Sequence, residues 1–125
     1  ATLTGACIVA LGNELAGLFS NDGGLAQSLT ACGQDAGENL WQLPLATEYR
    51  EEIKSPIADI KNVGSGSAGA ITAALFLQEF VSDVPWAHLD IAGPAFANKD
   101  HITCPKGGTG FGVRTLLNFL SGTGE

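Results

Sequence analysis

The first half of the chain alternates between apolar segments and short breaks that contain Gly, Asn or Asp. Residues 2–12 are apolar and rich in β-formers from the first position, which predicts a strand that runs to about Leu11. Gly12 and Asn13 then predict a turn, and residues 16–20 predict a short second strand. Because the first strand has no polar lead-in, the pattern favours a chain that begins inside a longer one.

Helical spacing follows the second predicted strand. Leu25, Leu29 and Cys32 recur at three- and four-residue intervals, as they do on one face of a helix. Asn21 and Asp22 offer N-caps for this helix. Its end is predicted at Gly33 or Gly37.

A second helix is predicted after residues 41–45. Thr47 is a suitable N-cap, and Pro56 bounds the helix. The early turns carry Glu48, Glu51 and Glu52, where negative charge is favoured by the helix dipole.

The second half predicts a strand, a helix and a strand in succession. The strands are expected at residues 57–63 and 86–93, and the helix at about 68–81, with Ile71, Ala74 and Leu75 on its apolar face. This order implies a right-handed crossover onto one sheet. The fold class is therefore α/β, a partial mixed sheet flanked by helices.

The last segment predicts a long loop and a terminal helix. Residues 96–110 have no clear period. The terminal helix gathers apolar side chains on one face: Phe111, Val113, Leu116, Leu117 and Leu120. No repeat or linker divides the chain, so residues 1–125 form one unit.

Composition narrows the function classes. Apolar residues make up 45% and charged residues 15%, which excludes a disordered chain. The net charge of -7 disfavours nucleic acid. No apolar run approaches the ~20 residues of a membrane span. Three cysteines without a CxxC pair and no visible targeting signal favour a reduced, cytoplasmic protein.

Small residues are abundant and large aromatic residues are few. The chain has 17 Gly, and six Phe, two Trp and one Tyr are available to fill a core. A free domain of this size would bury roughly two thirds of its chain surface. The composition therefore favours one layer of a larger domain.

One motif suggests a dinucleotide site. Gly64, Gly66 and Gly69 match the GxGxxG fingerprint before a helix, and Asp90 follows about twenty residues later, where a ribose-binding acid is expected. The preceding strand, however, is interrupted by polar residues. The simpler interpretation is a Gly/Ser segment that leads into a helix packed closely on the sheet.

Two further patterns suggest catalytic or metal chemistry. Ser67 lies one residue away from a nucleophile-elbow pattern, but His88 precedes Asp90 and both lie on one strand. His88, Asp90, His101 and Cys104 are potential metal ligands without a recurring zinc spacing. The simpler interpretation of His88 and Asp90 is that they satisfy loop backbone groups. Cys7 and Cys32 are interpreted as small apolar packing residues.

Six ordered blocks resemble the C-terminal part of the leucyl (cytosol) aminopeptidase family. They are TLTGA (2–6), GLFSN (17–21), LWQLPL (40–45), AITAALFL (70–77), WAHLDIAG (86–93) and TGFGVRTL (109–116). The match runs essentially from end to end, and six blocks in order are far more specific than one short motif.

The resemblance implies a two-metal hydrolase. In such an enzyme two divalent ions, Zn, Mn or Mg, activate a water that attacks the first peptide carbonyl. The family's metal ligands and catalytic Arg belong to an Asn-Thr-Asp-Ala-Glu-Gly-Arg motif and to earlier Lys and Asp residues, all upstream of Ala1. The resemblance thus implies a fragment of about a quarter of the enzyme, with no catalytic residue and no metal ligand of its own.

The resemblance also implies a substrate-binding wall. The Leu3 carbonyl would accept a hydrogen bond from the bound amino-terminal residue. The side-chain pocket would be lined by Thr2, Gly5, Ala92 and Ala95, because a leucine-sized group needs apolar space. Ala95 stands where some relatives carry a larger residue.

These observations give one main hypothesis and two alternatives. The main hypothesis is the C-terminal part of a cytosolic aminopeptidase that is hexameric, acts on peptides, and is inactive as this chain alone. The first alternative is a free-standing, non-catalytic binding or assembly module that self-associates through an unpaired edge of its first strand. The second is a dinucleotide-binding fragment at residues 64–69.

Overall fold

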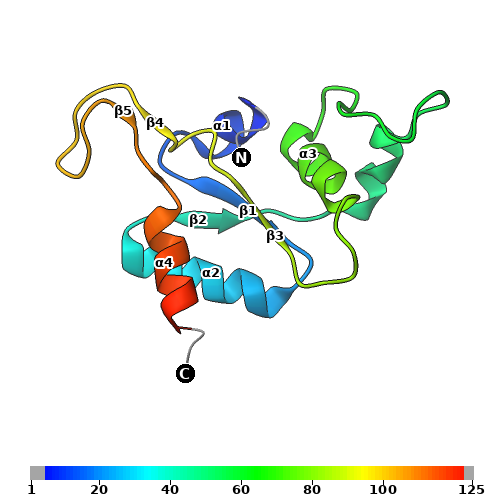
Figure 1. Cartoon of the computed structure of the whole chain (residues 1–125). Helices are drawn as coiled ribbons and strands as arrows, with labels where there is room; N and C mark the ends of the chain where they lie inside the picture. Colours follow the sequence, from blue (N-terminus) through cyan, green and yellow to red (C-terminus); the bar gives the residue numbers. More distant parts are fainter. Residues whose placement is uncertain (1–4, 123–125) are drawn as a thin grey trace.

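A three-stranded sheet with helices on both sides lies at the centre of the molecule (Figure 1). The computed structural model describes residues 5–122. Its strands are β1 (Ala16–Ser20), β2 (Leu40–Gln42) and β3 (Ala87–Asp90), in the spatial order β2-β1-β3. β1 pairs in parallel with β2 and antiparallel with β3. The α/β class with a partial mixed sheet is therefore confirmed.

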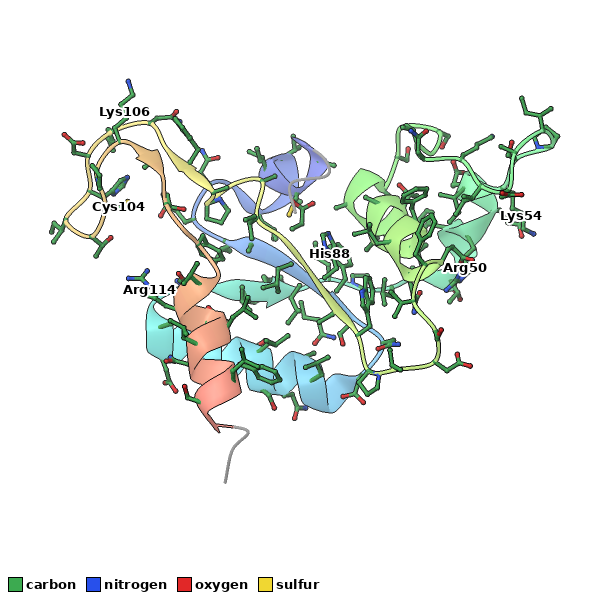
Figure 2. All side chains as sticks on the ribbon, viewed as in Figure 1. Arg50, Lys54, His88, Cys104, Lys106 and Arg114 are labelled. Carbon is green, nitrogen blue, oxygen red and sulfur yellow. The ribbon has the colours of Figure 1, made fainter. Side chains whose placement is uncertain are left out.

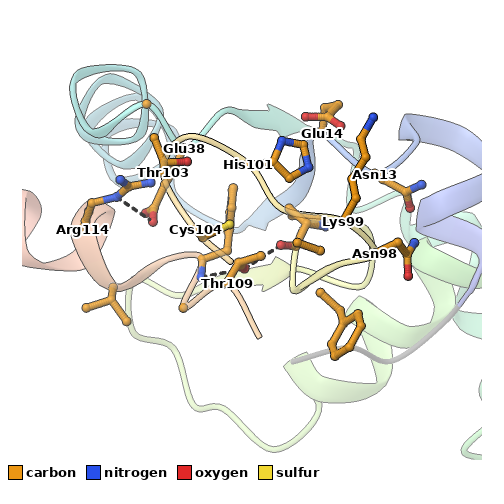
Figure 3. Close-up of a pocket in the computed structure, with 17 residues that line it drawn as sticks. Asn13, Glu14, Glu38, Asn98, Lys99, His101, Thr103, Cys104, Thr109 and Arg114 are labelled. Atoms are coloured by element: carbon orange, nitrogen blue, oxygen red, sulfur yellow. Dashed lines mark hydrogen bonds and ion pairs between the residues drawn. The ribbon is translucent and has the colours of Figure 1, made fainter. Parts of the chain in front are cut away.

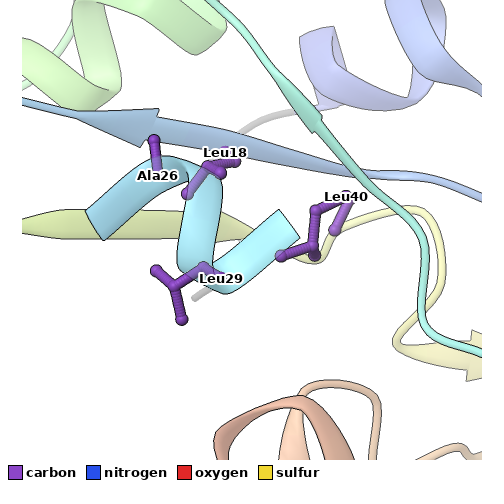
Figure 4. Close-up of a cluster of buried hydrophobic side chains, with 5 residues drawn as sticks. Leu18, Ala26, Leu29 and Leu40 are labelled. Atoms are coloured by element: carbon purple, nitrogen blue, oxygen red, sulfur yellow. The ribbon is translucent and has the colours of Figure 1, made fainter. Parts of the chain in front are cut away.

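One face of the sheet packs against α2 (Gly23–Ala36), and α4 (Val113–Gly122) packs against α2. Side chains of a strand alternate between the two faces, so every second residue of β1 contributes to this side. The buried cluster consists of Ala16, Leu18, Ala26, Leu29 and Leu40 (Figure 4).

The opposite face packs against α1 (Gly5–Leu11) and α3 (Gly69–Gln78). Its buried cluster consists of Cys7, Phe19, Ala70 and Ala74. Apart from Phe19 these side chains are small, so both helices approach the sheet closely. Gly17 of β1 contributes to this closeness, because a Cβ there would lie 2.9 Å from Cys7 Sγ.

The ends of α2 match the sequence prediction. The Asp22 carboxylate accepts a hydrogen bond from the Leu25 N–H at 2.7 Å and so caps the N-terminus. Gly37 adopts the left-handed conformation with φ 69° at the C-terminus, where a residue with a Cβ would be strained. The short strand predicted at residues 16–20 is confirmed as well.

The strand predicted over residues 2–12 is wrong, because residues 5–11 form α1. Cys7 is buried and Leu11 is half-buried four residues later, whereas Ile8 and Val9 are exposed. That is a helical period, and packing against β1 overrides the β propensity of Ile and Val. Residues 2–4 lie outside the described residues. The strand edge expected to drive self-association therefore does not exist over residues 5–11.

The strand predicted at residues 57–63 is also wrong. These residues are irregular, and Ile57 and Val63 are mostly exposed. The predicted crossover is absent with that strand: the parallel neighbours are β1 and β2, joined through α2, and β3 is antiparallel. A segment interrupted by Asp59, Lys61 and Asn62, with no neighbouring strand, gains nothing from extended pairing.

Several predicted boundaries shift in the structure. The helix expected from Thr47 is the 3-10 helix η1 (Thr47–Ile53), whose N-cap is Ala46 and not Thr47. The predicted loop at residues 96–110 contains a small hairpin of β4 (Phe96–Ala97) and β5 (Gly107–Gly108). The helix expected at about 68–81 is confirmed as α3, and the terminal helix as α4. Within residues 5–122, none of the helices is both long and apolar enough to cross a membrane.

Candidate functional site

β3 places His88 and Asp90 on the side of the sheet that α1 and α3 cover. His88 is 6% exposed, and its ring stacks on Phe19 with centroids 5.9 Å apart and on Trp86 at 6.3 Å. Figure 2 shows His88 between the sheet and α3. Burial disfavours the charged ring and lowers the pKa of His88 to about 4, so this imidazole is neutral at pH 7.

Asp90 connects the end of β3 to two neighbouring segments. Its side chain is fully buried, and Oδ1 accepts a hydrogen bond from the Ala92 N–H at 3.1 Å. Its backbone carbonyl accepts a weak hydrogen bond from the Cys7 thiol, with 3.8 Å between S and O. The expectation that Asp90 satisfies loop backbone groups is thus confirmed for Oδ1.

Two polar atoms at this position lack a partner among the described residues: His88 Nε2 and Asp90 Oδ2. Burial raises the pKa of Asp90, and the hydrogen bond from Ala92 opposes this shift. The pair is therefore a buried polar site beneath α1, and neither of its side chains is joined to Ser67 by a hydrogen bond within residues 5–122.

A close backbone approach joins the end of α1 to the turn after β3. A Cβ on Gly93 would collide with the Gly12 carbonyl oxygen and would lie 3.1 Å from Asn13 Cα. Only a residue without a side chain permits this contact. Gly93 and Asp90 together hold the turn at residues 92–95 against α1.

Hydrogen bonds fix the same turn from its other side. The Thr109 hydroxyl donates to the Pro94 carbonyl at 2.7 Å, and the Thr109 N–H donates to the Ala95 carbonyl at 3.0 Å. The Ala95 N–H donates to the Ile91 carbonyl, also at 3.0 Å. The backbone around Ala95 is therefore held at three points.

Two of the five residues expected to bind substrate, Ala92 and Ala95, lie in the braced turn. Gly5 begins α1, at the end of the helix away from the Gly93 contact. Thr2 and Leu3 lie outside the described residues. The sequence reasoning missed Gly12, Gly93 and Thr109. The Gly93-Pro94 break was a signal for a tight turn, but its contact with Gly12 depends on the tertiary structure.

An open cavity of about 810 Å³ lies beside this turn, with Asn13 and Pro94 in its wall (Figure 3). It is lined by residues of the β4–β5 hairpin and the start of α4, among them Lys99, His101, Cys104 and Arg114. His101 and Cys104 thus lie on the hairpin loop, and His88 and Asp90 do not line this cavity.

Neighbouring residues of the same chain satisfy the Glu38 carboxylate, which lines this cavity. Glu38 Oε2 accepts hydrogen bonds from the Thr115 N–H at 2.9 Å and the Thr115 hydroxyl at 2.7 Å, and Arg114 Nε lies 3.3 Å from Oε1. Burial tends to raise the pKa of Glu38, but these hydrogen bonds outweigh it and the pKa is lowered. Glu38 therefore joins the end of α2 to the start of α4.

The metal and dinucleotide patterns do not assemble into sites. Within residues 5–122, no three His, Cys, Asp or Glu side chains gather closely enough to hold a metal ion. The GxGxxG segment lacks the preceding strand that the dinucleotide fold requires, and Asp90 is buried under α1. Gly69 instead permits a close contact with Ala6, whose Cβ would lie 3.1 Å from a Cβ at residue 69. That contact joins α3 to α1. The packing of the helix on the sheet that the simpler interpretation predicted is made by Ala70 and Ala74, which cluster with Phe19 of β1.

Comparisons with known proteins show the family to which the chain belongs. Residues 1–117 match the model of the cytosol aminopeptidase family, catalytic domain. The chain is 57% identical over 120 residues to a probable cytosol aminopeptidase of Picosynechococcus sp., which covers 96% of this chain and 24% of the relative. A probable cytosol aminopeptidase of Syntrophotalea carbinolica is 58% identical with the same coverage. The chain spans about a quarter of the length of the curated relatives it matches.

Two solved structures share the fold of this chain. The bottromycin maturation enzyme BotP in complex with Mn superimposes with a TM-score of 0.95 at 46% identity, covering all of this chain and 28% of that protein. A mutant of tomato leucine aminopeptidase gives a TM-score of 0.87 at 43% identity, covering 94% of this chain and 22% of that protein.

We predict that Gly93→Ala destabilises the chain, because the new Cβ must displace the Gly12 backbone. Overpacking of this kind costs about 1–3 kcal/mol. Gly108→Ala is the matched control, since a Cβ there meets nothing within 4 Å. Urea unfolding of both variants measures the difference, and equal midpoints would show that the contact does not constrain the turn.

We predict that His88 makes the fold acid-sensitive. Its pKa of about 4 lies below the unfolded value of 6.5, so the unfolded chain binds the extra proton first and stability falls as the pH drops from 6.5 towards 4. The loss is about 3 kcal/mol across this window. His88→Phe keeps a ring between Phe19 and Trp86 and removes the titration. Unfolding free energies at pH 7 and pH 4 should differ less in the variant, and parallel pH profiles would contradict the prediction.

Proposed function

Because the chain belongs to the cytosol aminopeptidase family, we propose that it forms the C-terminal part of the catalytic domain of a metalloaminopeptidase that removes leucine-like residues from the N-termini of peptides. The observation that carries the proposal is the match to the family's catalytic domain over residues 1–117, at 57% identity to a named relative. The braced turn around Ala92 and Ala95 supports it, because a binding wall must hold its shape to be selective.

This chain's contribution is binding and orientation. Ala92, Ala95 and Gly5 offer small apolar surfaces, and the backbone of the turn is fixed by Gly93 and Thr109. A leucine side chain would be bound by apolar contact alone, with no buried polar group to compete for it. We assign Thr2 to the same pocket and the Leu3 carbonyl to the substrate's amino end on the resemblance.

The divalent ions of the proposed enzyme do not fit any group of side chains within residues 5–122. BotP was solved with Mn, and its chain is more than three times as long as the part that matches here. We therefore assign the metals, and with them the catalytic steps, to the part of the enzyme that precedes this chain. The preference for Zn, Mn or Mg, a hexameric assembly and a cytosolic location are parts of the same proposal, and the relatives' names support the last of these.

The chain alone is predicted to be inactive, and a chimaera is predicted to be active. The chimaera joins the preceding three quarters of the Picosynechococcus relative to this chain at the start of the matched segment. We expect metal-dependent cleavage of leucine anilide by the chimaera and none by the chain or by the preceding part alone. Cleavage by the pure chain would overturn the predicted inactivity. A folded but inactive chimaera would overturn the proposed function and favour a non-catalytic module.

The proposed substrate pocket predicts that a larger residue at position 95 changes the side-chain preference of the enzyme. In the chimaera, Ala95→Leu should narrow the pocket and lower kcat/KM for leucine anilide by roughly 10-fold or more, since one or two methylene groups are worth ~1–3 kcal/mol in such a pocket. Cleavage of alanine anilide should fall much less. Ala31→Leu on the exposed side of α2 is the control and should leave both rates unchanged. Equal losses for the two substrates in Ala95→Leu would remove this residue from the pocket.

A further inference from the structure

The terminal helix α4 has two apolar sides, and the described elements cover only one of them. Thr115 is fully buried, and Phe119 packs against the cluster between α2 and the sheet. On the other side, Val113 is 57% exposed, Leu116 46% and Leu117 59%. These three residues, spaced as i, i+3 and i+4, form a continuous apolar surface, which we call the α4 stripe.

Among residues 5–122, α2 is the element that packs extensively against α4, and Figure 1 shows α4 at the outside of the sheet with α2 on one side of it. The sequence placed Val113, Leu116 and Leu117 on the one apolar face of this helix. The structure turns Phe119 and Thr115 inward and leaves these three side chains exposed. Exposure of three branched apolar side chains on one helix is costly in water, since each contributes about 1.5–3 kcal/mol when fully buried.

The extent of the family match identifies the occupant. The family's catalytic-domain model extends to residue 117 and so includes the stripe, while the relatives are about four times as long as this chain. The relatives therefore contain further polypeptide that can pack here.

We propose that the α4 stripe is an interface inside the catalytic domain, covered by an apolar element of the polypeptide that precedes this chain. The proposal rests on the proposed function only in taking this chain as part of that larger domain, and it is independent of peptide hydrolysis. The covering element is apolar where it meets Val113, Leu116 and Leu117, because none of these side chains can satisfy a buried polar group.

The test compares one substitution in two settings. Leu117→Glu is made in the isolated chain and in the chimaera with the preceding part of the Picosynechococcus relative. In the isolated chain position 117 is exposed, so Tm should shift by less than about 2 °C. In the chimaera the carboxylate is buried in an apolar contact, and Tm should fall by about 5 °C or more.

Asn118→Glu is the matched control. It adds the same charge on the neighbouring position of α4, which faces α2 and has only a 3.4 Å hydrogen bond to the Cys32 carbonyl. Its effect should be small and equal in both settings.

Three outcomes overturn the proposal. The first is an equal, small effect of Leu117→Glu in both settings, which would leave the stripe uncovered in the domain. The second is a large loss in the isolated chain, which would show that its own residues already cover Leu117. The third is a concentration-dependent dimer of the isolated chain that Leu117→Glu dissolves, which would identify a second copy as the occupant. Tm is measured without substrate. An inactive chimaera with the expected Tm pattern would therefore overturn the proposed function but support this interface.

Discussion

β1 is the constraint on which the rest of the structure depends. Its first four residues are buried, and they form the centre of a sheet that is covered on both faces. Ala16 and Leu18 face α2, whereas Phe19 faces α1 and α3. Gly17 leaves space for Cys7, so α1 can lie directly on the strand. These residues set the distance between the sheet and the helical layer on each of its faces.

The candidate site follows from the same packing. Antiparallel pairing with β1 sets Asp90 opposite Gly17, beneath α1, where its backbone meets the Cys7 thiol. The chain then turns sharply at residues 92–95, and Gly93 rests on the last turn of α1. The end of α1 and the turn at residues 92–95 are therefore held together by the same packing. If this turn binds substrate as proposed, the scaffold shapes it before any ligand arrives.

The exposed apolar surface and the unpartnered polar atoms have a common physical explanation. An apolar stripe on α4, and buried nitrogen and oxygen atoms without partners on β3, are both unfavourable in an isolated domain. They lie on opposite sides of the sheet. The curated relatives are about four times as long as this chain, so they contain further polypeptide that is absent here.

The sequence by itself determined those features that depend on local chemistry or on many matched positions at once. The Asp22 cap, the Gly37 end of α2 and the existence of α3 were predictable, because capping and helical spacing act within a few residues. The family was recognisable from six ordered blocks. The roles of Thr2, Leu3, Gly5, Ala92 and Ala95 in binding are still predictions from that resemblance.

Tertiary structure alone decided what depends on residues far apart in the chain. Residues 5–11 have β-forming side chains and yet form a helix, because burial of Cys7 against β1 outweighs local preference. Residues 57–63 form no strand, because no neighbouring strand is there to pair with them. The contact of Gly93 with Gly12, and which side of α4 faces outward, could not be predicted from the sequence either. A sequence records which side chains are apolar or small, but only packing decides which of them meet.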